Sequence, residues 1–330
     1  MIISRAPLRM SFVGGGSDMP SFYRRHGGGA VISTAIKKYI FVTVNPKFDN
    51  GIRVAYSRTE EVATAREVEH QLVRAGLEIT GIEGGVEITT VADIPSRGTG
   101  LGSSSTFTVA LLHALHAFRG RYVSCCHLAE QACAIEIDIC GEPIGKQDQY
   151  AAAFGGFHVY EFHPDDTVTV SPVICQPSTL RQLDEWMLLL YTGMTRAASS
   201  LLKEQSEQIT SNPQKQEVLR RMVALCYGMR DEIQCDNLNA FGEILHEGWM
   251  LKRGLTSKIS NATIDDCYDV ARRHGAIGGK ILGAGAGGFL ALYAPPERHA
   301  AICHALPGLH KVPIGFDHAG SQIIFYQPNT

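Results

Sequence analysis

Residues 93–107, DIPSRGTGLGSSSTF, constrain the fold of this chain more than any other stretch. Glycines recur at 98, 100 and 102, and three serines then lead directly into an apolar run. Because glycine readily adopts positive φ, these glycines predict a tight loop whose backbone N–H groups can face one point. A helix starting at Ser103 adds its unpaired N–H groups and the positive end of its dipole. The sequence therefore predicts a loop-to-helix junction shaped to receive an anion.

Alternative interpretations of this junction can be compared. A Walker A loop is excluded, because that motif needs a lysine before the hydroxyl residue, whereas Gly102 is followed directly by Ser103. A glycine-rich connection with a serine N-cap explains the loop without any ligand, but it needs only one of the three hydroxyls. A phosphate-binding loop has a use for more of them. The residues alone leave these last two interpretations open.

A second glycine cluster, KILGAGAGGFLALYA, matches the pattern G-x-G-x-x-G at Gly283, Gly285 and Gly288. A dinucleotide-binding motif must leave a strand and enter a helix, whereas residues 289–293 have the composition of another strand. The cluster is either a β-hairpin turn or a glycine loop that closes against a bound nucleotide or substrate.

The third cluster, FVGGGSDMPSFYRRHGGGA, places Gly14, Gly15 and Gly16 shortly before Asp18. Backbone without side chains lets a ligand approach closely, and a carboxylate can accept hydrogen bonds from sugar hydroxyls. A turn aspartate, which only caps its own backbone, is the other interpretation of Asp18.

Two further carboxylates follow the serines. Glu136 lies within the apolar stretch LAEQACAIEIDIC, where a free carboxylate is costly unless it meets a cation. Asp148 lies twelve residues later, between two glutamines in GKQDQY. Phosphoryl transfer needs Mg²⁺ on the phosphates and an aspartate facing the acceptor hydroxyl, so this pair of carboxylates suits that reaction.

Composition excludes several classes of protein. The 330 residues include 30 basic and 33 acidic ones, with a net charge of −3 and no basic run, so we expect no nucleic-acid partner. None of the nine cysteines forms a C-x-x-C pair, which favours reduced thiols. No signal peptide and no apolar run of membrane-spanning length is present, which predicts a cytoplasmic protein without a membrane partner.

The pattern of elements predicts a mixed α/β first half and a second half that begins with helices and ends as β-β-α-β. Short strands fill the first ninety residues, with one helix expected over Glu60–Ala75. Helices are expected over Ser103–Phe118 and Ser124–Ile137. The boundary between the two halves is predicted near residue 190.

Three motifs in order, RAPLRMSFVGGGSDMPSFY, PSRGTGLGSSST and KILGAGAGGFLAL, resemble the signatures of the GHMP kinases, the superfamily of galactokinase, homoserine kinase and mevalonate kinase. The resemblance covers nearly the whole chain. The segments GKQDQYAAAFGGF and LHEGWMLKRGLTSKISN are most similar to the D-glycero-D-manno-heptose 7-phosphate kinases, whose neighbours are fucokinase- and galactokinase-like.

This resemblance implies an α+β, two-lobed fold. Residues 1–190 would form an N-terminal α/β lobe, similar to ribosomal protein S5, that carries the ATP-phosphate loop. Residues 191–330 would form a ferredoxin-like α+β lobe that carries the third motif.

The resemblance also implies a function: an ATP- and Mg²⁺-dependent kinase acting on the C1 hydroxyl of heptose 7-phosphate, in nucleotide-activated heptose biosynthesis. A kinase for an unphosphorylated sugar such as fucose or galactose, and a catalytically silent sugar sensor, are the alternatives. The expected partners are ATP and a small sugar phosphate, and the expected state is a monomer or homodimer.

Residue roles are carried over by position. The catalytic residues are Asp148 and Arg9, and the Mg²⁺ ligands are Glu136 and Ser104. ATP is assigned to Gly98, Gly100, Leu101, Gly102, Ser103, Ser104 and Ser105. The sugar is assigned to Gly15, Gly16, Asp18, Gln147 and Gly285. Candidate cations for the sugar phosphate are Arg24, Arg25, Arg196 and Lys203. Two positions depart from the expected pattern. This chain has Ala286 where related sequences often have glycine, and Lys146 where arginine or another residue is expected.

Overall fold

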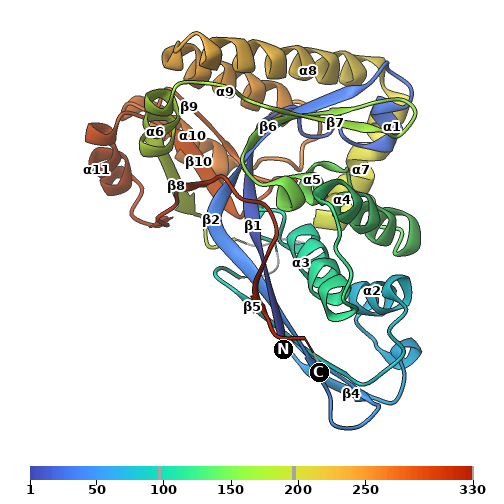
Figure 1. Cartoon of the computed structure of the whole chain (residues 1–330). Coiled ribbons are helices and arrows are strands. Elements are labelled where there is room, and N and C mark those ends of the chain that lie inside the picture. Colours follow the sequence, from blue (N-terminus) through green and yellow to red (C-terminus); the bar gives the residue numbers. More distant parts are fainter. Residues whose placement is uncertain (96–97, 195–197, 329–330) are drawn as a thin grey trace.

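The computed structural model describes residues 1–95, 98–194 and 198–328, and these residues form two β-sheets covered by helices (Figure 1). Within the described residues the larger sheet has nine strands and the smaller has four. Both contain segments that are far apart in the sequence.

The larger sheet is built around two long strands, β1 (Ile2–Val13) and β2 (Gly29–Pro46), which pair antiparallel along most of their length. One path through the sheet runs β13-β1-β2-β5-β3-β4. Strands β6 and β12 pair with the other half of β2, and β7 pairs with β6. The remaining strands are β3 (Ile52–Ala55), β4 (Thr59–Val62), β5 (Val86–Ala92), β6 (Phe157–Phe162), β7 (Val168–Pro172), β12 (Phe316–Asp317) and β13 (Gln322–Tyr326).

Helix α3 (Ser103–Phe118) is the central helix of this half, packed against β1 and β2. Twelve of its side chains are buried, including consecutive residues from Ser105 to Leu112, because the helix is apolar on nearly every side. Around it lie α2 (Gln71–Thr80), α4 (Cys125–Cys133) and α5 (Gln147–Phe154). Figure 1 shows these three helices on one side of the long strands. The buried α3 fixes the glycine loop that precedes it.

The smaller sheet has the order β11-β8-β10-β9, with every pair antiparallel. Its strands are β8 (Met187–Tyr191), β9 (Gly278–Ile281), β10 (Phe289–Tyr293) and β11 (His310–Lys311). Numbered along the chain, that order is 4-1-3-2, the ferredoxin-like arrangement. Helices α7 (Ala198–Ser211), α8 (Pro213–Gln234), α9 (Leu238–Arg253) and α10 (Ala262–Arg273) connect β8 to β9, and α11 (Pro296–Ala305) connects β10 to β11. The shorter helices α1 (Pro20–Tyr23) and α6 (Pro177–Trp186) complete the fold.

The α+β, two-lobed fold class is therefore confirmed, and the expected β-β-α-β ending appears as β9, β10, α11 and β11. The helix expected over Glu60–Ala75 is wrong. Residues Thr59–Val62 form β4, which pairs with β3, and the helix α2 begins only at Gln71. Strand pairing places Glu60 in a buried position, where its carboxylate accepts hydrogen bonds from the Tyr56 hydroxyl and the Glu69 backbone.

The boundary near residue 190 remains a prediction, and the sheets show how the chain crosses it. Strand β8, which ends at Tyr191, belongs to the smaller sheet, and β12 and β13 return from the end of the chain to the larger sheet. Figure 1 shows the two chain ends close together at the lower end of the long strands. None of the helices among the described residues combines the length and the apolar character that a membrane span needs.

Candidate active site

One cavity of about 490 Å³ collects residues from both halves of the chain. The residues predicted for catalysis, ATP, Mg²⁺ and the sugar ring all line it except Leu101 and Gly285. They come from β1 and the loop after it, the glycine loop and the start of α3, the π-helical turn Ala134–Ile139 after α4, and the start of α5. Residues of α7 and α9 complete the lining.

Two glycine loops from opposite halves touch at this cavity. A Cβ added to Gly100 would lie 2.3 Å from the carbonyl oxygen of Leu282, and one added to Gly283 would lie 2.4 Å from the Cα of Gly100. Both glycines have positive φ, 78° and 73°. Gly100 is therefore required by the contact between the loops. The second loop joins the antiparallel strands β9 and β10, as the hairpin interpretation predicts.

Arg9 and Asp148 form a two-pronged ion pair at the base of the first loop. The Arg9 Nε donates to Asp148 Oδ1 at 2.7 Å, and Nη2 donates to Oδ2 at 2.9 Å. The third nitrogen, Nη1, donates to the carbonyl of Gly100 at 2.6 Å. Arg9 is buried, whereas the Asp148 side chain keeps 24% exposure. The fork thus fixes an aspartate that still faces the cavity.

Glu136 is fully buried beside the first turn of α3. Ser104 Oγ donates to its Oε1 at 2.8 Å, and Gln149 Nε2 donates to its Oε2. Burial raises the pKa of this carboxyl to about 7, although hydrogen bonds from Ser105, Ser104 and Gln149 oppose the shift. These three partners are all neutral.

A Mg²⁺ ion fits this donor set. Mg²⁺ prefers oxygen ligands and is commonly held by one or two carboxylates together with substrate phosphates. Glu136 and Ser104 supply a carboxylate and a hydroxyl beside the N-terminus of α3, where phosphate groups are favoured.

Asp18 forms a second buried carboxylate, 2% exposed. It accepts hydrogen bonds from the backbone N–H of Gly16 at 2.8 Å and from Gln147 Nε2 at 2.9 Å. Burial is the largest cause that raises its pKa, and the nearby charge of Asp148 adds to it. A Cβ at Gly145 would lie 2.0 Å from Asp18 Oδ2, so the aspartate occupies space that only a glycine leaves.

The structure adds a cation to the cavity, Lys252, which our sequence analysis did not single out. It is 5% exposed near the end of α9, and its Nζ donates to the carbonyl of Gly283 at 2.7 Å. Burial, together with the neighbouring charge of Arg9, lowers the pKa of Lys252 to about 8. The signal was present in the helical register, because Lys252 follows Leu245 and Trp249 on the buried face of α9.

Gln205 was missed in the same way. It lines the cavity from α7 and is 2% exposed. The neighbours at i−4 and i+4, Leu201 and Ile209, are also buried, so a polar side chain interrupts an apolar face. Such an interruption is a detectable sequence signal, but it becomes interpretable only when the elements facing the helix are known.

The remaining predicted residues lie elsewhere. Leu101 is buried, and its carbonyl accepts the backbone N–H of Arg9 at 3.2 Å. Gly285 lies against Ile259, whose carbonyl would be 2.5 Å from an added Cβ. Neither position gives support to the predicted ligand role.

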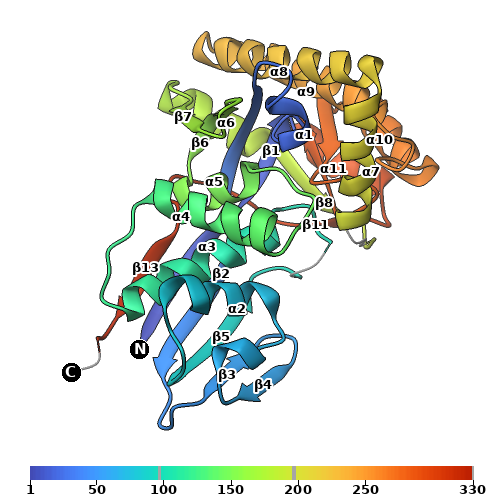
Figure 2. The ribbon, with the colours of Figure 1, turned by 90° about the vertical axis from the view of Figure 1, so that its right-hand side faces the viewer.

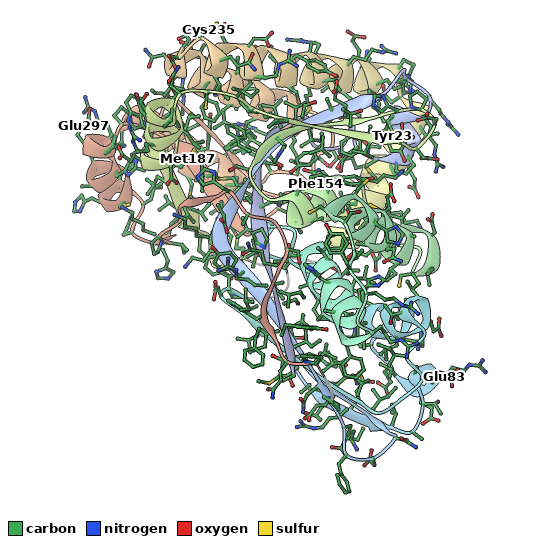
Figure 3. All side chains as sticks on the ribbon, viewed as in Figure 1. Tyr23, Glu83, Phe154, Met187, Cys235 and Glu297 are labelled. Atoms are coloured by element: carbon green, nitrogen blue, oxygen red, sulfur yellow. The ribbon has the colours of Figure 1, made fainter. Side chains whose placement is uncertain are left out.

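Three of the four candidate phosphate-binding cations are described, and none of these three lines the cavity. Arg24 binds Asp166 at 2.9 Å, together with Lys146 and the hydroxyl of Tyr23, which is labelled in Figure 3. Arg25 and Lys203 are exposed, and Arg196 lies outside the described residues. The three described candidates, Arg24, Arg25 and Lys203, are therefore not supported as ligands by the cavity.

Comparison with known families gives two matches. Residues 61–156 match the family described as "GHMP kinases N terminal domain", and residues 229–308 match the family described as "GHMP kinases C terminal". The two matched regions contain α3 with its glycine loop, Glu136, Asp148, Lys252 and the second glycine loop.

Individual relatives cover most of the chain. The D-glycero-alpha-D-manno-heptose 7-phosphate kinase of Campylobacter jejuni is 27% identical over 92% of this chain and 93% of its own length. The bifunctional fucokinase/GDP-fucose pyrophosphorylase of Arabidopsis thaliana is 26% identical over 89% of this chain, which spans only 30% of that longer protein. A crystal structure of a D-glycero-D-manno-heptose 1-phosphate kinase from Bacteroides thetaiotaomicron has a TM-score of 0.80 and 26% identity, covering 99% of this chain and 100% of the other.

Proposed function

This chain belongs to the GHMP kinase family, and we propose that it transfers the γ-phosphoryl group of ATP to the C1 hydroxyl of D-glycero-D-manno-heptose 7-phosphate. The product is the 1,7-bisphosphate, an intermediate of nucleotide-activated heptose biosynthesis. The name of the Campylobacter relative, which aligns over nearly its whole length, supports the choice of sugar.

The observation that carries the proposal is the meeting of two carboxylates across one cavity. Asp148, oriented by Arg9, faces the cavity from α5, and Glu136 lies with Ser104 at the N-terminus of α3. Phosphoryl transfer needs these two functions, an aspartate facing the acceptor and an oxygen-ligand site beside the phosphates.

Each residue has a proposed role in the reaction. Asp148 accepts the proton of the C1 hydroxyl as its oxygen bonds to the γ-phosphorus, and the bond between that phosphorus and the ADP oxygen breaks. Arg9 orients Asp148 and stabilises the charge that spreads over the transferred group. Ser103, Ser104 and Ser105, with the glycine loop before them, bind the ATP phosphates through the first N–H groups of α3. Mg²⁺, held by Glu136 and Ser104, would neutralise charge on those phosphates.

The acceptor is proposed to lie along Gly15, Gly16 and Asp18, with Gln147 beside them. Asp18 is already fixed by hydrogen bonds from Gly16 and Gln147, so a sugar hydroxyl meets a carboxylate that needs no reorientation. The use of ATP agrees with the predicted cytoplasmic location, which stays a prediction together with the oligomeric state.

The test is an ADP-release assay with four acceptors: heptose 7-phosphate, heptose 1-phosphate, fucose and galactose. We expect turnover of heptose 7-phosphate and none of heptose 1-phosphate, because the second compound already carries a phosphate on the C1 oxygen that would accept the phosphoryl group. Phosphorus NMR of the product should show two phosphate groups, one of them anomeric.

Two other outcomes have defined meanings. Preferred turnover of free fucose or galactose would assign the chain to an unphosphorylated sugar, as the fucokinase relative suggests. Binding of a sugar without consumption of ATP would favour the silent sensor.

A further inference from the structure

Gln205 carries a buried amide that lacks a hydrogen-bonding partner. Its side chain is 2% exposed, and its Nε2 atom has no partner among the described residues. Most buried side-chain amides in proteins are hydrogen bonded, because an unpaired N–H loses its interaction with water without replacement. The residue lines the cavity. An unpaired donor on a ligand cavity indicates a missing acceptor.

Helix α7 holds this amide in a defined place. Ser206, the next residue, donates to Ser21 Oγ at 3.0 Å and so ties α7 to α1. Figure 2 shows α7 running beside α1, below the long helices α8 and α9. The buried side chains of Leu201 and Ile209 lie one turn before and one turn after Gln205. The amide is therefore positioned by its own helix and by an anchored neighbour.

The amide lies against the glycine pair that we assign to the acceptor. A Cβ added to Gly16 would lie 2.5 Å from Gln205 Nε2, so the missing side chain of Gly16 leaves the space that the amide uses. The backbone N–H of the same glycine donates to Asp18. Gln205 and Asp18 thus flank one glycine from two different parts of the chain.

A second donor approaches the neighbouring glycine. A Cβ added to Gly15 would lie 3.6 Å from Lys252 Nζ and equally far from Gln147 Nε2. The pair Gly15 and Gly16 is therefore bordered by an acceptor, Asp18, and by donors that include Lys252 and Gln205. A sugar hydroxyl both donates and accepts hydrogen bonds, so neighbouring hydroxyls can give one bond to the carboxylate and receive another from an amide.

We propose that Gln205 Nε2 donates a hydrogen bond to a hydroxyl of the acceptor sugar and that this residue determines which sugar is used. The inference rests on the proposed sugar kinase function and adds a specificity residue from the C-terminal half. Sites that hydrogen bond a substrate hydroxyl reject analogues that lack it, because their own polar group is then left unpaired.

The test combines a protein variant with substrate variants. Gln205→Leu removes the donor and keeps a similar volume. Gln208→Leu, three residues further along α7, is the matched control. It removes the same kind of amide, but the Gln208 amide already donates a hydrogen bond to Glu204. Both are assayed by ADP release with the sugar that the wild type phosphorylates and with its monodeoxy analogues.

The wild type should lose at least tenfold in kcat/KM with the deoxy analogue that lacks the hydroxyl bound by Gln205. The Gln205→Leu variant should lose at least tenfold with the parent sugar and nothing further with that analogue, and its KM for ATP should not change. Gln208→Leu should discriminate as the wild type does. Gln205→Glu, which keeps the size but replaces the donor, repeats the test if the leucine variant does not fold.

Three results would overturn the inference. The first is a Gln205→Leu variant with wild-type kcat/KM for the parent sugar. The second is a uniform loss for every sugar with unchanged discrimination, which indicates a structural role. The third is a wild type that phosphorylates no sugar at all, and this result alone also removes the proposed function.

Discussion

At the scale of single residues, the site depends on how each carboxylate is held. Asp148 accepts two hydrogen bonds from the charged guanidinium of Arg9, whose third nitrogen donates to the Gly100 carbonyl. Glu136, in contrast, accepts hydrogen bonds only from neutral donors. Two carboxylates with such different surroundings suit two different roles, one in proton transfer and one in binding a cation.

Asp148→Asn tests the first role. Asparagine keeps the size and can still meet Arg9, but it cannot accept the proton of the sugar hydroxyl. We expect kcat to fall by about 10² to 10⁴ while Mg·ATP binding, measured by calorimetry, is retained. Turnover near the wild-type rate in a variant with native circular dichroism would remove Asp148 from the chemical step.

Glu136→Gln tests the second role through the pH dependence of stability. Burial raises the pKa of Glu136 to about 7 from its usual value near 4.5. Between these two pH values the folded state therefore binds more protons than the unfolded state, and wild-type stability falls as pH rises through this window. The fall attributable to this group is at most about 3 to 4 kcal/mol, since one pKa unit corresponds to about 1.4 kcal/mol.

Urea unfolding without Mg²⁺, at pH 5 and at pH 7.5, measures that fall. Asp18 also has a pKa raised by burial, so the informative quantity is the difference between the wild type and Glu136→Gln. The variant should lose less stability than the wild type over this interval, and excess Mg²⁺ should restore part of its activity. If the stability of both proteins depended equally on pH, the raised pKa of Glu136 in the folded state would be contradicted.

At the scale of elements, local sequence predicted best where backbone conformation is decided locally. The loop at residues 98–102 and the helix from Ser103 appear as expected, because glycine spacing and an apolar run determine them. The helix over Glu60–Ala75 failed because the pairing of β4 with β3 outweighed its helical spacing. Lys252 and Gln205 were missed because the periodicity of a helix shows which face is buried but not which elements pack against that face.

The contact between the glycine loops gives a prediction at this scale. A side chain at Gly100 meets the Leu282 backbone, whereas one at Gly141 meets nothing within 4 Å, although both residues have positive φ. Gly141→Ala should therefore lower the free energy of unfolding by about 1 kcal/mol, the strain of an alanine at positive φ. Gly100→Ala should lower it by more and should also weaken ATP binding. Urea unfolding and calorimetry compare the two variants, and equal losses would mean that the loops tolerate separation.

At the scale of the whole molecule, neither half completes its own sheet. Strand β8 precedes residue 192 but pairs with β10 and β11, and β13 pairs with β1 from the other end of the chain. The cavity has the same construction, because Lys252 and Gln205 face residues of the first half.

A fragment of residues 1–190 should therefore not fold by itself into a form that binds ATP. We expect no cooperative thermal transition by circular dichroism, and co-expression with residues 191–330 should restore one. Cooperative unfolding of the isolated fragment, with ATP binding by calorimetry, would establish residues 1–190 as an autonomous unit.

The contact of Gly100 with Leu282 also affects how the protein is made. The first glycine loop leaves the ribosome well before the residues that it touches, by roughly 10 to 40 s at usual rates of translation. Until Leu282 and Gly283 emerge, the nascent chain lacks the backbone against which this loop is packed. Nucleotide can then help to stabilise the chain only near the end of its synthesis, and earlier intermediates must avoid aggregation without a ligand.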